Sequence, residues 1–443
     1  MKRVLVAMVV LSMCLVDFTG TALVENTGAL AGTLGTAFAA SPAGKVVKIG
    51  GLWPLTGSVA DLGGEHMRGA TYAVERINGK EGGIKSLGGA KIELVLGDSK
   101  SDKTEGVAEA EKLITRDDVL AISGAYQSAV TLPSCTIAQR NQVPYLVDSA
   151  ISNEISQRGF DWVFRPCTPS IGWASGQFDF LNWLNKGYVN KMGGPLKTLG
   201  LLYENTAYGQ STSGDWKKFA KEKGFTIVID LPYSTGSTDL TSEINRLKGA
   251  KPDVVLMVSY ASDAILIANT MAEIKYSPRV ILTSGGGHST REFQQAVGKK
   301  IEGLFNMIGT WNADVKTQFN EFFPAEYEKR WKEKLSSHSA QGGSNVYILR
   351  DALEIAGASA GGWDAWNRLS LQAKRDAVRK ALVGYKSTNS PPVFGYESTM
   401  EFKTWENWTN QNPNWSPGIV QFQGGSYRSV FPEGVAAAKP VFK

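Results

Sequence analysis

The side chains that most often bind metals or carry covalent chemistry are few in this sequence. The three histidines, His66, His288 and His338, lie far apart in the chain and have no partners at metal-ligand spacing. We therefore expect neither a metal site nor a cofactor. Cys135 and Cys167 either form one disulfide bridge or remain two buried thiols. In either case the fold is not a disulfide scaffold, since one pair of cysteines is too few for one.

Two segments partly match enzyme motifs, but each lacks a residue that the motif requires. Residues 209–213, Gly-Gln-Ser-Thr-Ser, lack the closing glycine of a nucleophile elbow and do not directly follow an expected strand. Residues 51–58 have neither the spacing nor the lysine of a phosphate-binding P-loop. The sequence favours a non-enzymatic role, with a secreted hydrolase as an alternative.

The first forty residues predict export. Lys2 and Arg3 precede an apolar run over residues 4–16, which is too short to span a bilayer comfortably. Small residues follow, and residues 37–41, Ala-Phe-Ala-Ala-Ser, fit the preference of signal peptidase. We expect a signal peptide over residues 1–39 and a periplasmic or extracellular mature protein. An N-terminal membrane anchor and lipidation at Cys14 are the alternatives.

The composition indicates a globular protein. About 400 mature residues are enough for two domains with substantial cores. The net charge of +5 is spread along the chain, and no segment has the basic density of a nucleic-acid binder. A mild positive balance permits an anionic ligand without requiring one.

Strand and helix patterns alternate through most of the chain. Compact apolar segments with little polar alternation predict strands covered on both faces, and helices with one apolar stripe lie between them. Asp102, with Glu105 three residues later, predicts one helix start. Expected strands cover 46–52, 91–96, 119–123, 144–147, 198–203, 226–231, 254–259, 280–283 and 303–308. Expected helices begin near 63, 102, 129, 210, 240, 262, 319 and 346.

This rhythm restarts after residues 165–166, so it predicts two doubly wound α/β sheets in series. The ligand-facing edge of each sheet should lie at the carboxyl ends of its strands. The last seventy residues are strand-like and rich in tryptophan.

The chain resembles the leucine/isoleucine/valine-type, or type I, periplasmic binding proteins of ABC transporters. The most similar segment is residues 49–57, Ile-Gly-Gly-Leu-Trp-Pro-Leu-Thr-Gly, which looks like the family's first strand and turn. Residues 144–158 resemble a cleft loop, and residues 164–166 and 301–304 resemble two hinge crossings. The resemblance implies two doubly wound, Rossmann-like lobes joined by three hinge crossings. It places 46–166 and 310–370 in the N-terminal lobe, and 167–300 and 371–443 in the C-terminal lobe.

The same resemblance implies a ligand site between the lobes. Ser128 falls where the family holds a ligand carboxylate, and a hydroxyl with backbone amides at a helix start suits an anion. The alternative interpretation is that these residues do not contact a ligand. Ser128 would then only cap a helix, Trp53 would belong to the core, and His288 would be a solvated loop residue. The implied ligand-binding residues are Trp53, Tyr126, Gln127, Ser128, Ser149, Ala150, Ile151, Tyr208, Tyr260, Gly286 and His288.

One departure from the family bears on the ligand. Amino-acid binders of this family carry an acid on the second lobe that pairs with the ligand's ammonium, but residues 283–288, Thr-Ser-Gly-Gly-Gly-His, contain none. The three glycines would leave room or bare amides. Burying an ammonium without a countercharge is costly, so a carboxylate or amide without an ammonium competes with an amino acid as ligand.

The resemblance thus implies the extracytoplasmic binding component of an ABC importer. It would act as a monomer that captures an amino acid, aromatic acid or amide and delivers it to a membrane permease, without binding nucleic acid. A ligand-sensing domain of the same fold is the second alternative.

Overall fold

A computed structural model describes residues 44–308, 311, 313, 317–388, 399–415 and 417–442. The expected signal peptide over residues 1–39, with Cys14, lies outside the described residues.

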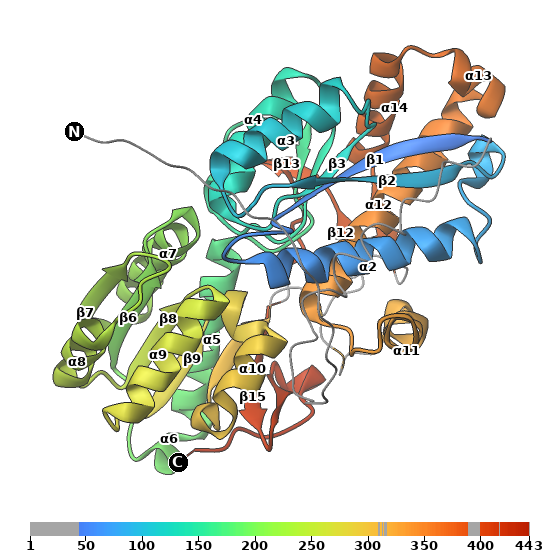
Figure 1. The fold of residues 1–443 in the computed structure, drawn as a ribbon. Coiled ribbons are helices and arrows are strands. Elements are labelled where there is room, and N and C mark those ends of the chain that lie inside the picture. The colour runs from blue at the N-terminus through green and yellow to red at the C-terminus, as the bar shows by residue number, and fades with distance from the viewer. Residues whose placement is uncertain are drawn as a thin grey trace, which may run out of the picture. The chain divides into compact units, whose positions relative to one another are not determined.

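The first sheet contains five parallel strands in the order β2-β1-β3-β4-β5. Strand β1 pairs along its whole length with β2, from Val46 opposite Lys91 to Trp53 opposite Asp98, and its other edge pairs with β3. Helices α3 and α4 lie on one side of β1 and β2, and α2 with α12 on the other (Figure 1). The elements are β1 (Val46–Trp53), α2 (Ala60–Asn78), β2 (Lys91–Asp98), α3 (Lys103–Thr115), β3 (Ile122–Gly124), α4 (Ser128–Arg140), β4 (Tyr145–Val147) and β5 (Val163–Phe164).

The second sheet has seven strands in the order β16-β15-β10-β9-β8-β6-β7. Strands β6 to β10 are parallel, and β15 joins antiparallel to β10. The elements are α5 (Ser170–Gly187), α6 (Val189–Met192), β6 (Thr198–Glu204), α7 (Ala207–Lys223), β7 (Thr226–Tyr233), α8 (Thr241–Ala250), β8 (Val254–Val258), α9 (Ala261–Glu273), β9 (Val280–Thr283), η3 (Gly286–Ser289), α10 (Arg291–Val297), η4 (Gly298–Ile301) and β10 (Phe305–Ile308).

The remaining elements return to the first sheet before the chain ends on the second. They are α11 (Gln318–Trp331), α12 (Ser337–Ala360), α13 (Trp363–Arg368), α14 (Leu371–Val383), β11 (Lys386–Thr388), β12 (Thr399–Glu401), β13 (Lys403–Trp405), β14 (Trp408–Gln411), β15 (Gly418–Gln423) and β16 (Ser426–Phe431). The doubly wound α/β fold expected from the alternating pattern is confirmed.

Local signals explain many of these boundaries. The carboxylate of Asp102 accepts hydrogen bonds from the amides of Thr104 and Glu105, so it caps α3 as expected. Gly224 ends α7 in the left-handed conformation that glycine adopts without strain. Helix α12 departs most from expectation: it begins at Ser337 rather than near Val346, and Ser336 caps it.

We call the parts of the chain around the two sheets the first and second lobes. The largest buried hydrophobic cluster of each lobe is its core, and two smaller clusters also belong to the second lobe. The first core takes in residues far along the chain, including Val378 and Leu382 of α14 and Met400 of β12. The sequence analysis placed residues 371–443 together in the second lobe. The packing differs: α14 and β12 lie in the first core, whereas Ile419 and Val430 lie in the second.

The chain passes between the sheets three times, between β5 and α5, β10 and α11, and β14 and β15. The first crossing falls at residues 164–166 as expected. The second was expected at 301–304, but β10 still pairs with β9 and β15, so the chain leaves the second sheet only after Ile308.

The first and third crossings are bound to each other through Arg165. Its backbone exchanges hydrogen bonds with the carbonyl of Asn410 and the amide of Asn412. Its guanidinium donates to Gln411 Oε1 at 2.5 Å and to the Ser152 carbonyl at 2.6 Å. Full burial lowers the pKa of Arg165 to about 10. A buried arginine that bonds two crossings fixes these two strands side by side.

Among the helices of the described residues, none combines the length and the apolar composition that crossing a membrane would require.

Candidate functional site: a cavity between the two lobes

A cavity lies at the carboxyl ends of the strands of both sheets. Its empty volume is about 490 Å³, including solvent at its mouth. Both strand orders reverse beside it, at β1 and β3 in one sheet and at β6 and β8 in the other. The cavity is lined by Tyr126, Ser128, Ser149, Ile151, Trp173, Tyr208, Tyr260, Gly286, Ser289, Met307, Ile308, Ser337, His338 and Gln341.

Ser128, the first residue of α4, provides a hydroxyl at a helix N-terminus on the first-lobe wall. Its Oγ accepts a hydrogen bond from the Ser152 amide at 3.2 Å. Because the amide uses a lone pair of this oxygen, the Ser128 hydroxyl hydrogen remains available for a ligand. The N-terminal end of a helix favours negative charge, so this wall suits a carboxylate.

Behind the same wall, the buried carboxylate of Asp148 positions three neighbouring groups. It accepts hydrogen bonds from Trp53 Nε1 at 2.6 Å, from the Tyr126 amide at 3.1 Å and from the Ser149 amide at 2.7 Å. Asp148 is fully buried, so these donors compensate for much of the lost solvation. The carboxylate thereby fixes the backbone that presents Tyr126 and Ser149 to the cavity.

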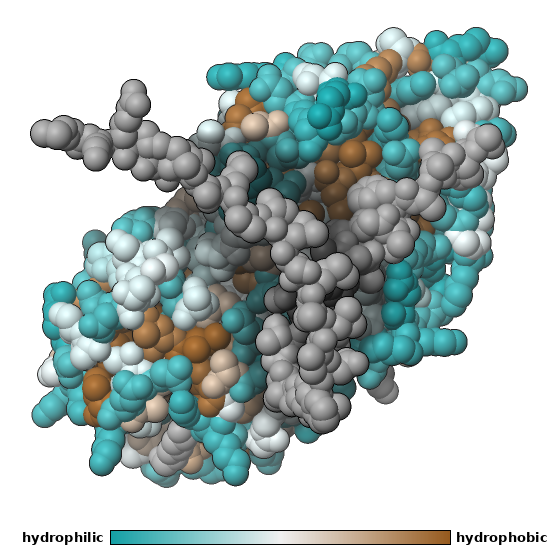
Figure 2. All heavy atoms as spheres, viewed as in Figure 1, coloured by the Kyte–Doolittle hydropathy of each residue, from teal (hydrophilic) through white to brown (hydrophobic). Residues whose placement is uncertain are grey.

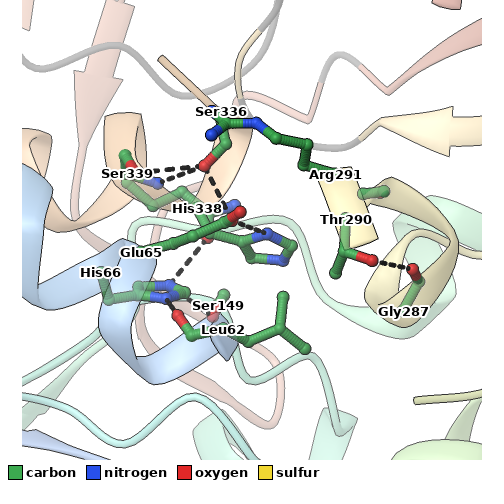
Figure 3. A network of polar contacts seen from close by, with 12 residues as sticks. Leu62, Glu65, His66, Ser149, Gly287, Thr290, Arg291, Ser336, His338 and Ser339 are labelled. Atoms are coloured by element: carbon green, nitrogen blue, oxygen red, sulfur yellow. Dashed lines mark hydrogen bonds and ion pairs between the residues drawn. The ribbon is translucent and has the colours of Figure 1, made fainter. Parts of the chain in front are cut away.

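Two histidines lie in one polar network, which reaches the cavity at His338 (Figure 3). The rings of His66 and His338 are 5.3 Å apart. His66 Nδ1 donates to the Leu62 carbonyl at 2.9 Å, and burial lowers the pKa of His66. The neutral ring then accepts at Nε2 from the Ser149 hydroxyl, 3.0 Å away. The fold thus brings together two histidines that lie far apart in the chain, although among the described residues no group of three or more possible metal ligands is found.

His338 is held by an acid on α2. Its Nδ1 lies 3.2 Å from Glu65 Oε2, which also accepts from the Ser336 hydroxyl at 2.8 Å (Figure 3). Burial raises the pKa of Glu65, but the hydrogen bonds from His338 and Ser336 outweigh burial and leave the pKa below its usual value. Glu65 is thus ionised, and its carboxylate fixes the orientation of the His338 ring at the cavity.

Aromatic rings form the second-lobe wall. Tyr208 lies in the first turn of α7, Tyr260 precedes α9, and Trp173 lies in the first turn of α5. The rings of Tyr208 and Tyr260 are 5.7 Å apart, and Tyr260 lies 6.2 Å from Tyr126 of the first lobe. Burial raises the pKa of all three tyrosines well above the usual value, so their hydroxyls stay neutral.

The charge pattern of the cavity restricts its ligands. Among the described residues, none of those lining it is an aspartate, glutamate, lysine or arginine. The polar side-chain groups of its described lining are hydroxyls, one amide side chain, the Trp173 indole and the His338 ring. Such a lining binds through hydrogen bonds and apolar surface rather than through a full opposite charge.

The comparisons with known proteins agree with this geometry. The model of the periplasmic binding protein family matches residues 46–399, most of the chain. The chain belongs to this family. Its members are extracytoplasmic solute-binding proteins and not enzymes.

Curated relatives and solved structures support the assignment of this periplasmic binding protein. Leu/Ile/Val-binding protein homolog 7 of Brucella suis is 32% identical over 90% of this chain and 95% of its own, and homolog 8 is 31% identical over 92% and 95%. A leucine-binding protein from Thermotoga maritima has a TM-score of 0.71 at 21% identity and covers 87% of this chain and 98% of its own. The fold is therefore that of the type I periplasmic binding proteins.

The structure brings most of the expected site residues together. Tyr126, Ser128, Ser149, Ile151, Tyr208, Tyr260 and Gly286 line the cavity, while Gln127 and Ala150 are buried beside them outside its lining. Their roles in ligand binding remain predictions.

Two expected site residues lie elsewhere in this binding protein. Trp53 is fully buried and its indole is bonded to Asp148, so it supports the first-lobe wall from behind. His288 is also buried, its ring packs against Phe293 at 5.1 Å, and it lines a different cavity within the second lobe. The short helix η3 explains this, because it directs Gly286 to the cleft and His288 away from it.

Sequence reasoning missed seven lining residues. Trp173 follows the first crossing, Met307 and Ile308 end β10, and Ser337, His338 and Gln341 begin α12; Ser289 ends η3. The polar run from Ser336 concealed the first turns of α12. The cap serine was the signal that could have revealed them.

Proposed function

We propose that this periplasmic binding protein is the substrate-capturing component of an ABC importer. We infer a small ligand with a carboxylate or amide and an apolar or aromatic body. The observation that carries the proposal is a cavity between both lobes, with aromatic rings on one wall and, among the described residues of its lining, no acidic or basic side chain apart from His338.

The ligand's carboxylate would lie against the first lobe. Ser128 at the start of α4 offers a hydroxyl hydrogen, and the amide near Ile151 is the second donor that we propose. These donors need no balancing cation because the helix end itself favours an anion. Tyr208 and Tyr260 would then close over the ligand body from the second lobe.

An amino acid is a poorer ligand for this lining. Its ammonium would be buried with no carboxylate among the residues that line the cavity, at a cost of several kcal/mol. Solved structures of this fold contain both kinds of ligand. A substrate-binding protein from Streptococcus pneumoniae holds isoleucine. Its TM-score is 0.69 at 21% identity, and the match covers 88% of this chain and all of its own. A solute-binding protein from Rhodopseudomonas palustris holds benzoate, with a TM-score of 0.71 at 20% identity, covering 89% and 99%.

Ligand capture would proceed by closure of the lobes about the three crossings. Two polar contacts between the lobes support this. Asn153 of the first lobe donates to Asp215 on α7 at 2.8 Å, and Arg291 on α10 pairs with Glu333 at 3.0 Å. A ligand that touches both walls favours the closed state by its extra affinity for that state.

Export completes the proposal. Cleavage near Ala39 or Ala40 would release a mature protein into the periplasm or its equivalent, where it would meet a membrane permease. Intact-mass measurement of the protein secreted by a bacterial host tests this step. A mass that retains residues 1–38 would contradict it, as would a lipid on Cys14.

A thermal-shift screen tests the ligand class. Benzoate, hydroxybenzoates, leucine, isoleucine, leucinamide and short aliphatic carboxylates are each added to the purified protein. A ligand of the native state must raise the melting temperature, and we expect carboxylates and amides without an ammonium to give the largest shifts. Larger shifts with leucine or isoleucine would contradict the proposed ligand class. Hydrolysis of any ester or amide would instead favour the alternative of a secreted hydrolase. Co-purification of a signalling partner would favour a ligand-sensing domain of the same fold.

A further inference from the structure

The indole of Trp173 carries a hydrogen-bond donor that has no partner. Trp173 lines the cavity and is 7% exposed, and its Nε1 atom is buried without a hydrogen bond among the described residues. An indole N–H can only donate. Unpartnered buried donors are rare in folded proteins because their lost hydration is not replaced, so this donor needs an explanation.

Three acceptors of the second lobe are already used by other donors. The Ser284 carbonyl accepts from the Tyr208 hydroxyl. Gln177 Oε1 accepts from Trp216 Nε1 at 2.7 Å, and Asn306 Oδ1 accepts from the Gly285 amide at 2.9 Å. The unpartnered donor thus belongs to a residue that lines the cavity, where a ligand could supply the missing acceptor.

The glycines of residues 285–287 make the position of this indole possible. Gly285 has φ of +57°, and a Cβ there would lie 2.6 Å from two carbons of the Trp173 ring. A Cβ on Gly286 would lie 2.7 Å from the Tyr208 hydroxyl. The sequence analysis expected these glycines to leave room or bare amides. The space is instead filled by the Trp173 and Tyr208 rings.

We propose that Trp173 is a specificity-determining residue, and that the ligand body carries an oxygen acceptor that bonds its Nε1. This inference rests on the proposed function and narrows the ligand class. The ligand is a small carboxylate or amide with an apolar or aromatic body and, apart from its polar end, a carbonyl, hydroxyl or ether oxygen. The Tyr208 hydroxyl does not compete for this ligand oxygen, because it already donates its hydrogen to the Ser284 carbonyl.

Matched pairs of carboxylates test the inference. In each pair a carbonyl oxygen is replaced by a methyl group of similar size: meta- and para-acetylbenzoate against the isopropylbenzoates, and levulinate against isocaproate. Affinities are measured by calorimetry for the native protein and for Trp173→Phe, which keeps an aromatic ring and removes the donor. Trp183→Phe is the matched control, because the Trp183 indole bonds Glu433 and lies outside the cavity lining.

In the native protein we expect the acceptor of the best-binding pair to improve the affinity by about 5- to 150-fold, the range for one buried hydrogen bond. Trp173→Phe should reduce this preference to within about threefold, and Trp183→Phe should keep it. A preference that survives in Trp173→Phe would overturn the inference, as would pairs that bind without any preference. If no carboxylate binds the native protein, the proposed function itself fails and the inference with it.

A second measurement uses only the folded native protein for its decisive comparison. In protein labelled with ¹⁵N at the tryptophan indoles, para-acetylbenzoate should move one indole N–H resonance downfield, and para-isopropylbenzoate should not. Absence of this resonance from the Trp173→Phe spectrum assigns it. Equal shifts with both compounds would show that the oxygen does not bond the indole.

Discussion

Gly285→Ala gives the sharpest test of how the second-lobe wall is built. The new methyl group would lie 2.6 Å from Cη2 and Cζ3 of Trp173, closer than real Cβ contacts come. Both carbons belong to a ring that is packed in the second core on one side and lines the cavity on the other, so the ring can move only into the cavity or against its core neighbours. The backbone would also have to hold alanine at φ of +57°.

The magnitude follows from these two effects. An L-residue held at φ of +57° and ψ of −128°, a sparsely populated region, costs about 1–3 kcal/mol relative to glycine, and overpacking a close-packed core costs about 1–3 kcal/mol. We therefore expect Gly285→Ala to lower the free energy of unfolding by about 2–6 kcal/mol. It should also weaken ligand binding, since the Trp173 ring can only yield toward the cavity or the core.

Urea unfolding followed by tryptophan fluorescence measures the stability change. Gly214→Ala is the matched control, because Gly214 lies on the exposed side of α7 with no atom within 4 Å of its added Cβ. That variant should be unchanged or more stable by about 0.5–1 kcal/mol. A Gly285→Ala protein within about 0.5 kcal/mol of the native protein would refute the close contact between Gly285 and Trp173.

The remaining predictions concern closure, pH and the cysteines. Arg291→Ala removes the half-exposed ion pair with Glu333 across the cleft, so calorimetry should show binding up to about fivefold weaker with the melting temperature of the free protein unchanged. Burial lowers the pKa of His288 to about 3, so the unfolded chain takes up this proton first and stability falls as pH drops from about 6.5 toward 3. His288→Gln should lose less stability between pH 7 and pH 4 than the native protein, as measured by urea unfolding. Cys135 and Cys167 are free and buried, which raises the pKa of each thiol to about 12, so a disulfide-exchange reagent at pH 8 should label them only after unfolding.

The sequence predicted the parts of the site that depend on strand ends. Parallel strands place the residues that follow them at one edge of a sheet, which is why Ser128, Ser149, Tyr208 and Tyr260 could be assigned to one region before any coordinates. Periodicity marked β8 and α9 closely, because a fully buried strand and an amphipathic helix give strong patterns.

The parts that could not be predicted depend on which way a side chain faces. Trp53 is the last residue of β1 and His288 lies in η3. Nothing in the local sequence shows that the Trp53 side chain is directed at Asp148 and the His288 side chain at the other cavity, within the second lobe. The first turns of α12 carry polar residues because they face the cavity, so they lack the apolar stripe by which helices are recognised.

Long-range packing also explains why the lobe boundary expected at residue 371 differs from the observed one. Residues 371–388 and 399–402 have ordinary helix and strand patterns that do not indicate which core they join. Their place in the first lobe is set by contacts with distant elements, such as the Arg375 guanidinium, which donates to the carbonyls of Val119 and Ile114.

The central claim is that a small carboxylate or amide is held, unchanged, between Ser128 and the aromatic wall. Calorimetric titration of the best-binding carboxylate into the native protein and into Ser128→Ala tests it most directly. We predict one ligand per chain, recovered chemically intact, and a dissociation constant raised about 5- to 150-fold by the substitution, which corresponds to about 1–3 kcal/mol for one buried hydrogen bond. An unchanged dissociation constant would contradict the account, as would recovery of a chemically altered ligand.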